Sequence, residues 1–113
     1  MVLGEAMACG LPIVSADCPT GPREFLAPET IGHAVRPLLV AERGAFGLLL
    51  PIPDEHKVAT IDVWVKELDQ LLGDAPELAI MSHQSLARAE DFTREKIGAQ
   101  WLALVEELVV TSA

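Results

Sequence analysis

The chain has few basic residues for its size and no long hydrophobic run. It carries 8 lysines and arginines against 17 aspartates and glutamates, a formal net charge of -9 over 113 residues. Such a charge repels phosphate backbones and anionic lipid surfaces, so nucleic acid is not an expected partner. The longest apolar segments, residues 46–52 and 101–105, are shorter than the roughly 20 residues that cross a bilayer. We therefore expect no membrane-spanning segment.

Cysteine and clustered metal ligands are also scarce. Cys9 and Cys18 have neither CxxC spacing nor the density of a disulfide scaffold, so we expect reduced, buried thiols in a cytoplasmic protein. No basic region precedes the first apolar residues, which argues against a signal peptide. His33, His56 and His83 share no ligand spacing, so we expect them on the surface and assign no metal, no cofactor and no general base.

The rest of the chain is organised around a helix, strand and loop unit in residues 4–25, which read GEAMACGLPIVSADCPTGPREF. Helix formers run over residues 1–9, and Gly10 suits the left-handed position after a helix end. No strong capping residue precedes this pattern, so we expect the helix to begin upstream of Met1. Residues 12–15 include two β-branched side chains between proline and aspartate, which predicts a short strand of a parallel sheet, buried on both faces.

The segment that follows combines turn formers with a second apolar run. Residues 17–21 favour a turn, and Pro22 is suited to the first position of a short helix with Gly21 as its N-cap. The pattern is lost over residues 27–45, which we interpret as a long connection within one domain. Residues 46–51, FGLLLP, predict a second buried strand.

Three helices are expected after the second strand. Asp54 is the expected N-cap of the first, which ends at Gly73 and has apolar residues at steps of three and four: Val58, Ile61, Val65, Leu68 and Leu72. A helix over residues 74–91 carries a weaker stripe: Leu78, Met81, Leu86 and Ala89. Thr93 caps the last helix, whose apolar face is Ile97, Trp101, Leu104 and Leu108. We expect Trp101 to be a core residue rather than a platform for a sugar ring.

Two strands joined by a crossover and followed by helices indicate an α/β protein with a parallel sheet. Two strands alone leave open edges that expose backbone hydrogen-bonding groups. We therefore expect further strands upstream, or a homodimer formed through the open sheet edge. No internal repeat or second domain is visible in the sequence.

Residues 4–25 resemble the C-terminal signature of the retaining GT-B glycosyltransferases known as group 1 or family 4. In that family a glutamate, seven residues and a second glutamate lead into EAMA-x-G-x-P-V-V, followed by a glycine loop with a trailing glutamate. This chain has EAMACGLPIV at 5–14 and CPTGPRE at 18–24. Residues 46–49, FGLL, before Pro51 are similar to a later strand of the family, so the resemblance covers essentially the whole chain.

The resemblance implies two Rossmann-like domains facing a cleft. Residues 1–113 would then be a partial C-terminal nucleotide-sugar-binding domain, helix-rich at its end. The parent enzyme would transfer a hexosyl unit with retention from a nucleotide diphosphate sugar, expected to be a UDP-sugar, to a glycan or lipid-linked acceptor in polysaccharide biosynthesis. No metal is implied. Because the first glutamate of the pair would precede Met1, we expect the chain alone to be inactive and assign no catalytic residue.

The same resemblance selects candidate residues for binding the sugar nucleotide. Glu5 would be the second glutamate of the pair, and its carboxylate can accept both ribose hydroxyls. Thr20 and Gly21 precede a predicted helix start, where free amides favour a diphosphate or a sugar hydroxyl. Arg23 is a further candidate, because a guanidinium binds phosphate in bidentate fashion.

Three alternatives stay open. Arg23 can instead be a solvated partner of Glu24 or Glu29. The non-hydrolysing UDP-sugar 2-epimerases share the GT-B architecture, although Glu5 and its neighbours favour a transferase. The chain can also be a non-catalytic module that associates with itself through its open strand edge.

Overall fold

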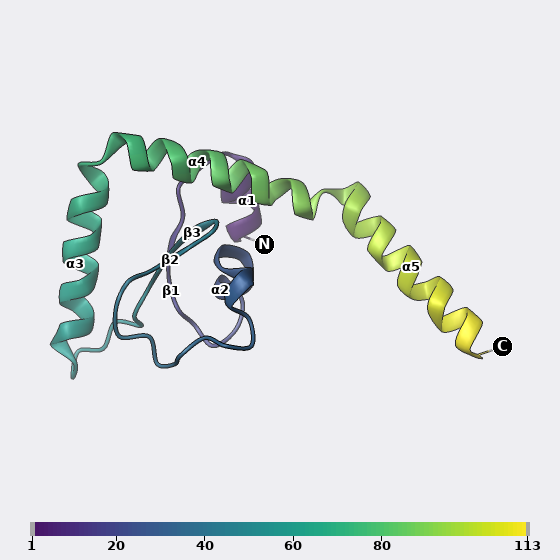
Figure 1. The fold of residues 1–113 in the computed structure, drawn as a ribbon, viewed down its shortest axis with the longest axis horizontal. Coiled ribbons are helices and arrows are strands. Elements are labelled where there is room, and N and C mark those ends of the chain that lie inside the picture. Colours follow the sequence, from purple (N-terminus) through teal and green to yellow (C-terminus); the bar gives the residue numbers. More distant parts are fainter. Residues whose placement is uncertain (1, 113) are drawn as a thin grey trace.

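A computed structural model describes residues 2–112 (Figure 1). The elements, in chain order, are α1 (Val2–Ala8), β1 (Val14–Ala16), α2 (Pro22–Leu26), the 3-10 helix η1 (Pro28–Thr30), β2 (Glu42–Gly44), β3 (Gly47–Leu50), α3 (Val58–Leu72), α4 (Ala75–Ala89), the 3-10 helix η2 (Glu90–Phe92) and α5 (Arg94–Ser112). The strands lie between α3 on one side and α1 with α2 on the other. Helix α4 crosses one end of this unit, and α5 extends away from it (Figure 1).

The sheet is mixed rather than wholly parallel. β1 and β3 are parallel, with Val14 opposite Leu48, which confirms the parallel pairing expected for the two apolar runs. β2 is antiparallel to β3 on its other side, so the strand order is β1-β3-β2. The prediction that residues 27–45 only connect two strands is therefore wrong. Among residues 2–112, no strand pairs with the outer edge of β1.

The β2–β3 hairpin is held tightly against the end of α2. Phe46 donates its backbone N–H to the carbonyl of Leu26 at 2.9 Å. A Cβ atom at Gly44 would lie 2.3 Å from that same carbonyl oxygen and 2.7 Å from the Cβ of Ala27. Only glycine leaves room for this approach, so Gly44 fixes where β2 can run.

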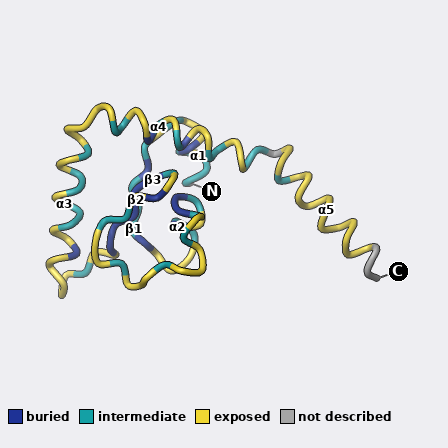
Figure 2. Tube along the Cα trace, viewed as in Figure 1, coloured by how far each residue is buried: buried dark blue, intermediate teal, exposed yellow. Residues whose placement is uncertain are grey.

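β3 is buried on both faces and divides the core into two clusters. Leu49 packs with Met7 of α1 and Leu26 of α2. Leu48 and Leu50, which point to the opposite face because side chains alternate along a strand, pack with Met81 of α4 and with residues of α3. Figure 2 shows the buried positions gathered in the strands, α1 and α2. β1 is only half-buried, in contrast to its predicted burial on both faces.

Helix α4 binds the connection between α1 and β1 through two serine hydroxyls. Ser82 Oγ donates to the carbonyl of Gly10, and Ser85 Oγ donates to the carbonyl of Leu11, both at 2.6 Å. Gly10 has a φ of +71°, as predicted for the residue that ends α1. One turn further along α4, Arg88 donates to backbone carbonyls at the end of α2. α4 therefore joins the N-terminal helix, the first strand and α2.

The expected N-cap and the expected packing face of α3 are both wrong. Lys57, not Asp54, is the N-cap. Asp54 lies in the tight turn before the helix, where its carboxylate accepts the backbone N–H of His56 at 2.9 Å. The predicted stripe forms a helix, but most of it faces solvent, with exposed side chains at Val58, Ile61, Val65 and Leu72. The packed side chains come from the adjacent face: Val63, Trp64 and Leu71.

Helix α5 has the predicted start but not the predicted environment. The hydroxyl of Thr93 accepts the backbone N–H of Lys96 at 3.2 Å, which confirms the cap. Trp101 is 64% exposed, so its assignment to the core is wrong. The helix extends away from the sheet and is mainly exposed along its length (Figures 1 and 2).

The surface predictions for cysteine and histidine have mixed outcomes. Cys9 and Cys18 are free, as expected, but both are exposed rather than buried. Cys9 directly follows α1, and Cys18 lies in the loop after β1. His33, His56 and His83 are exposed, as predicted. No helix among the described residues is long and apolar enough to cross a membrane.

Candidate functional site

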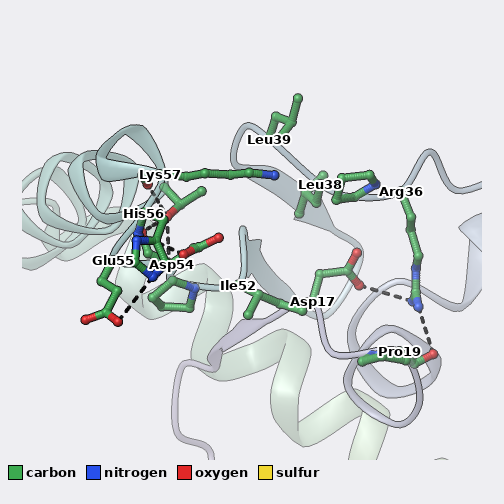
Figure 3. Close-up of a pocket in the computed structure, with 13 residues that line it drawn as sticks. Asp17, Pro19, Arg36, Leu38, Leu39, Ile52, Asp54, Glu55, His56 and Lys57 are labelled. Atoms are coloured by element: carbon green, nitrogen blue, oxygen red, sulfur yellow. Dashed lines mark hydrogen bonds and ion pairs between the residues drawn. The ribbon is translucent and has the colours of Figure 1, made fainter.

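A cleft of about 650 Å³ opens at the carboxyl ends of β1 and β3 (Figure 3). Its walls come from the loop after β1, with Asp17 and Pro19, from residues 36–39, and from residues 52–57 after β3, together with Thr60. Open α/β sheets bind ligands in crevices outside the carboxyl ends of their strands. The position of the cleft therefore makes it a candidate ligand site.

A second cavity of about 390 Å³ lies beside the start of α2. Gly21 and Arg23 line it, together with residues 31 and 32 of the following loop. Pro19 and Arg36 line both cavities. These two residues therefore form the boundary between the cleft and the smaller cavity.

Arg23 is the centre of a buried ion-pair network. Its Nε and one terminal nitrogen donate to the two oxygens of Asp17 at 3.2 and 3.1 Å. The terminal nitrogens donate to both oxygens of Glu42 at 2.5 and 3.2 Å, and one donates to Thr30 Oγ1 at 2.8 Å. A guanidinium has five N–H groups, so all five are engaged. Hydrogen bonding to Glu42, and then to Asp17, raises the pKa of Arg23 above its already high ordinary value, so it stays charged.

This network corrects the pairing that the sequence suggested. The partners of Arg23 are Asp17 and Glu42, not Glu24 or Glu29, and the side chain is 3% exposed rather than solvated. Glu42 comes within reach only because β2 forms. The network joins the loop after β1 to η1 and β2. The prediction that Arg23 binds phosphate is not tested by these contacts, which leave it no unengaged N–H group.

Asp17 is a second buried charge that the sequence reasoning missed. It is 4% exposed and lies between two guanidinium groups, because Arg36 also donates to its Oδ1 at 3.2 Å. Arg36 further donates to the carbonyl of Pro19 at 2.7 Å. An aspartate directly after a strand is a recognisable signal for a residue at the carboxyl edge of a sheet. Arg36 lies in an irregular loop and carries no such signal.

The predicted nucleotide-sugar residues do not share one cavity in this structure. Glu5 is exposed on α1, and neither cavity is lined by it. Thr20 is exposed in the loop after β1, and Gly21, with a φ of 103°, is the N-cap of α2, as expected. Gly21 and Arg23 line the smaller cavity. Thr20 and Gly21 in the loop after β1 and Arg23 in α2 are thus near one another in the chain, while Glu5 lies apart on α1.

The opposite wall of the cleft comes from the turn before α3. Thr60 Oγ1 accepts the backbone N–H of Asp54 at 2.9 Å and donates to the carbonyl of Lys57 at 2.7 Å, which fixes the turn. His56 and Glu55 form an exposed ion pair at 3.5 Å when the histidine is protonated. Among residues 2–112, no group of three or more His, Cys, Asp or Glu side chains has a geometry that could hold a metal ion.

Two proteins of known name are similar to the chain. An uncharacterized glycosyltransferase of Methanocaldococcus jannaschii is 29% identical over an alignment of 123 positions, which covers 90% of this chain and 27% of that protein. The lipopolysaccharide 1,6-galactosyltransferase of Escherichia coli strain K12 is 43% identical over 37 residues, 33% of this chain and 10% of that protein. No protein-family model and no solved structure matches. The chain thus spans about a quarter or less of these relatives, and both similarities support a glycosyltransferase.

Proposed function

We propose that the chain is part of a glycosyltransferase and binds its nucleotide-sugar donor in the cytoplasm. The whole enzyme would be a retaining GT-B transferase that moves a hexosyl unit from a UDP-sugar to a glycan or lipid-linked acceptor. The observation that carries the proposal is the similarity of 90% of the chain to a protein named as a glycosyltransferase. The motif EAMACGLPIV at 5–14 and a cleft at the carboxyl edge of the sheet support it.

Each candidate residue has a role in this proposal that its position permits. Glu5 is exposed, and its carboxylate forms no hydrogen bond or ion pair with another described residue, so it is free to accept ribose hydroxyls. Thr20 and Gly21 contact the diphosphate or the sugar from the loop after β1. Arg23 belongs to the same site through the loop that it holds at Asp17.

Titration of the labelled chain with UDP, followed by NMR, tests this function. We expect weak binding with shifts at the amides of Glu5 and of residues 20–23. Glu5→Gln should weaken binding by about ten-fold, the usual loss for one hydrogen bond to a charged group. Glu95→Gln, at an exposed glutamate of α5, is the matched control and should bind as the unaltered chain does. Absence of any shift at residues 5 and 20–23 at millimolar UDP would refute the proposal.

A second proposal concerns assembly, since a non-catalytic module that associates with itself was the competing interpretation. β1 pairs with β3 on one side only among the described residues, and an unpaired strand edge is a template for another strand. We propose that two copies meet along the outer edge of β1. Analytical ultracentrifugation should then detect a dimer that Ala16→Pro weakens. Ile13 and Asp17 bond to β3, so the backbone N–H of Ala16 faces the outer edge of β1, and proline removes it. A monomer at high concentration would contradict it.

A further inference from the structure

We propose that Arg36 binds the diphosphate of the sugar nucleotide. This inference rests on the proposed function and names the cation that receives the charged part of the ligand. Arg36 lies on the boundary between the two cavities at the carboxyl edge of the sheet, and its guanidinium points to the loop after β1 (Figure 3). A nucleoside diphosphate is the ligand class, because it joins a doubly charged anion to a flat, largely uncharged base.

The first reason is that Arg23, the arginine next to the motif, is fully engaged. Its five N–H groups all have acceptors, and two carboxylates compensate its charge. Moving it to a phosphate would leave Asp17 buried without its bidentate partner, which is costly. The other cations of the cleft, Arg36 and Lys57, are therefore the candidates for the diphosphate.

The second reason is the set of hydrogen bonds made by Arg36. Two of its five N–H groups donate, one to Pro19 and one to Asp17. The contacts among residues 2–112 leave the other three for solvent or a ligand. Asp17 already accepts two hydrogen bonds from Arg23, so its negative charge only partly neutralises Arg36. The side chain is 36% exposed yet held at two points, and such preorganisation lowers the entropy cost of binding.

The third reason is the composition of the cleft. Lys57, on the opposite wall, has a side chain that extends toward the segment with Leu38 and Leu39 (Figure 3), and its ammonium group has no ion pair among the described residues. Glu55 points away from the cleft in the same view. Apolar side chains on both walls suit a base: Leu38, Leu39, Ile52 and Pro53. The carboxylate of Asp54 lines the same wall as Lys57 and opposes an anion there, so we place the anion at the Arg36 end.

Titrations of the chain with UDP and with uridine, followed by NMR, test the assignment. Arg36→Ala should weaken UDP binding by about ten-fold to a hundred-fold, the range for a lost charge-assisted contact, and leave uridine binding unchanged. Arg36→Lys should retain part of the affinity for UDP, since lysine keeps the positive charge but not the planar, bidentate donor geometry of a guanidinium. Arg43→Ala is the matched control. Arg43 is exposed to a similar degree and ion-paired with Glu77, but it lines neither the cleft nor the smaller cavity beside α2, so its variant should bind UDP normally.

Each other outcome overturns the inference in a recognisable way. An equal loss for UDP and uridine would mean that Arg36 acts only by holding the loop at Pro19. Normal UDP binding by Arg36→Ala would remove Arg36 from the site while the proposed function stands. If the unaltered chain does not bind UDP, the proposed function fails. Titration with inorganic pyrophosphate then tests separately whether Arg36 forms an anion site. Pyrophosphate binding that Arg36→Ala abolishes would retain the anion site, and its absence would refute that site as well.

Discussion

Arg23 and Glu42 form a bidentate ion pair between α2 and β2, with N to O distances of 2.5 and 3.2 Å across 19 positions of sequence. The pair ties α2 to the strand that is antiparallel to β3, and Arg23 also holds Asp17 of the loop before α2. It thereby couples the sheet to the wall of the candidate site.

We expect Arg23→Ala to destabilise the fold by about 3–5 kcal/mol, because it leaves the Asp17 carboxylate buried and one cation short. Urea unfolding followed by circular dichroism measures this loss. Lys66→Ala, at an exposed position of α3, is the control and should change stability by less than about 0.5 kcal/mol. Equal losses for the two variants would contradict a structural role specific to Arg23.

Substitution of two glycines by alanine should have opposite effects. Gly44→Ala places a Cβ atom 2.3 Å from the carbonyl oxygen of Leu26, so the β2–β3 hairpin must move and stability should fall by more than about 2 kcal/mol. Gly98→Ala meets no atom within 4 Å and lies inside α5, where alanine gains about 0.5–1 kcal/mol over glycine. Thermal unfolding of the two variants shows whether each substitution raises or lowers stability. An unchanged stability of Gly44→Ala would argue against the close contact of the β2–β3 hairpin with α2.

Ser85→Ala should cost about 1 kcal/mol, because it removes a hydrogen bond from a fully buried hydroxyl to the Leu11 carbonyl. Ser82→Ala should cost a similar amount through Gly10. His83→Ala, at an exposed position of the same helix, is the control and should be neutral or slightly stabilising. Equilibrium denaturation separates these cases, and a loss confined to His83→Ala would exclude the proposed anchoring by α4.

The two tryptophans should report different surroundings in fluorescence. Trp101 is 64% exposed, so Trp64→Phe should leave emission typical of a solvated indole that acrylamide quenches readily. Trp64 is half-buried and donates its Nε1–H to the carbonyl of Pro51 at 2.7 Å, so Trp101→Phe should leave blue-shifted and protected emission. Protected emission from Trp101 would mean that the outward face of α5 is covered in solution.

Both cysteines should react with a thiol reagent in the native state. Cys9 and Cys18 are exposed and unpaired with each other, so two equivalents of label should be incorporated without denaturant. A lag that disappears on unfolding would show that at least one thiol is buried, as the sequence alone suggested.

The sequence predicted those elements whose signals are local. Apolar runs near β1 and β3, Pro22 at the start of α2, and Thr93 before α5 each act within a few residues. β2 was missed because Glu42 and Arg43 form neither an apolar run nor an alternating pattern, and the strand exists through its pairing with β3. The site was incomplete for the same reason, since the contacts of Arg36 with Asp17 depend on the tertiary path of a loop.

The apolar stripe of α3 illustrates another limit of periodicity. The spacing of Val58, Ile61 and Val65 correctly predicts a helix, but it does not say which side packs. Trp64 and Leu71 of the adjacent face pack against the cluster of Leu48, Leu50 and Met81 instead. Periodicity therefore identifies the helix, while the tertiary path of the chain decides which face packs.

The serine contacts of α4 also constrain the order in which the chain can fold. The two hydrogen bonds span sequence separations of 72 and 74 positions. During synthesis the segment around Gly10 therefore emerges long before α4, which packs on it. At typical translation speeds this interval is roughly 4 to 15 seconds. During that time the first strand has no α4 to cover it and its edge is open to other chains. We therefore expect the nascent chain to be most prone to aggregation before α4 has emerged.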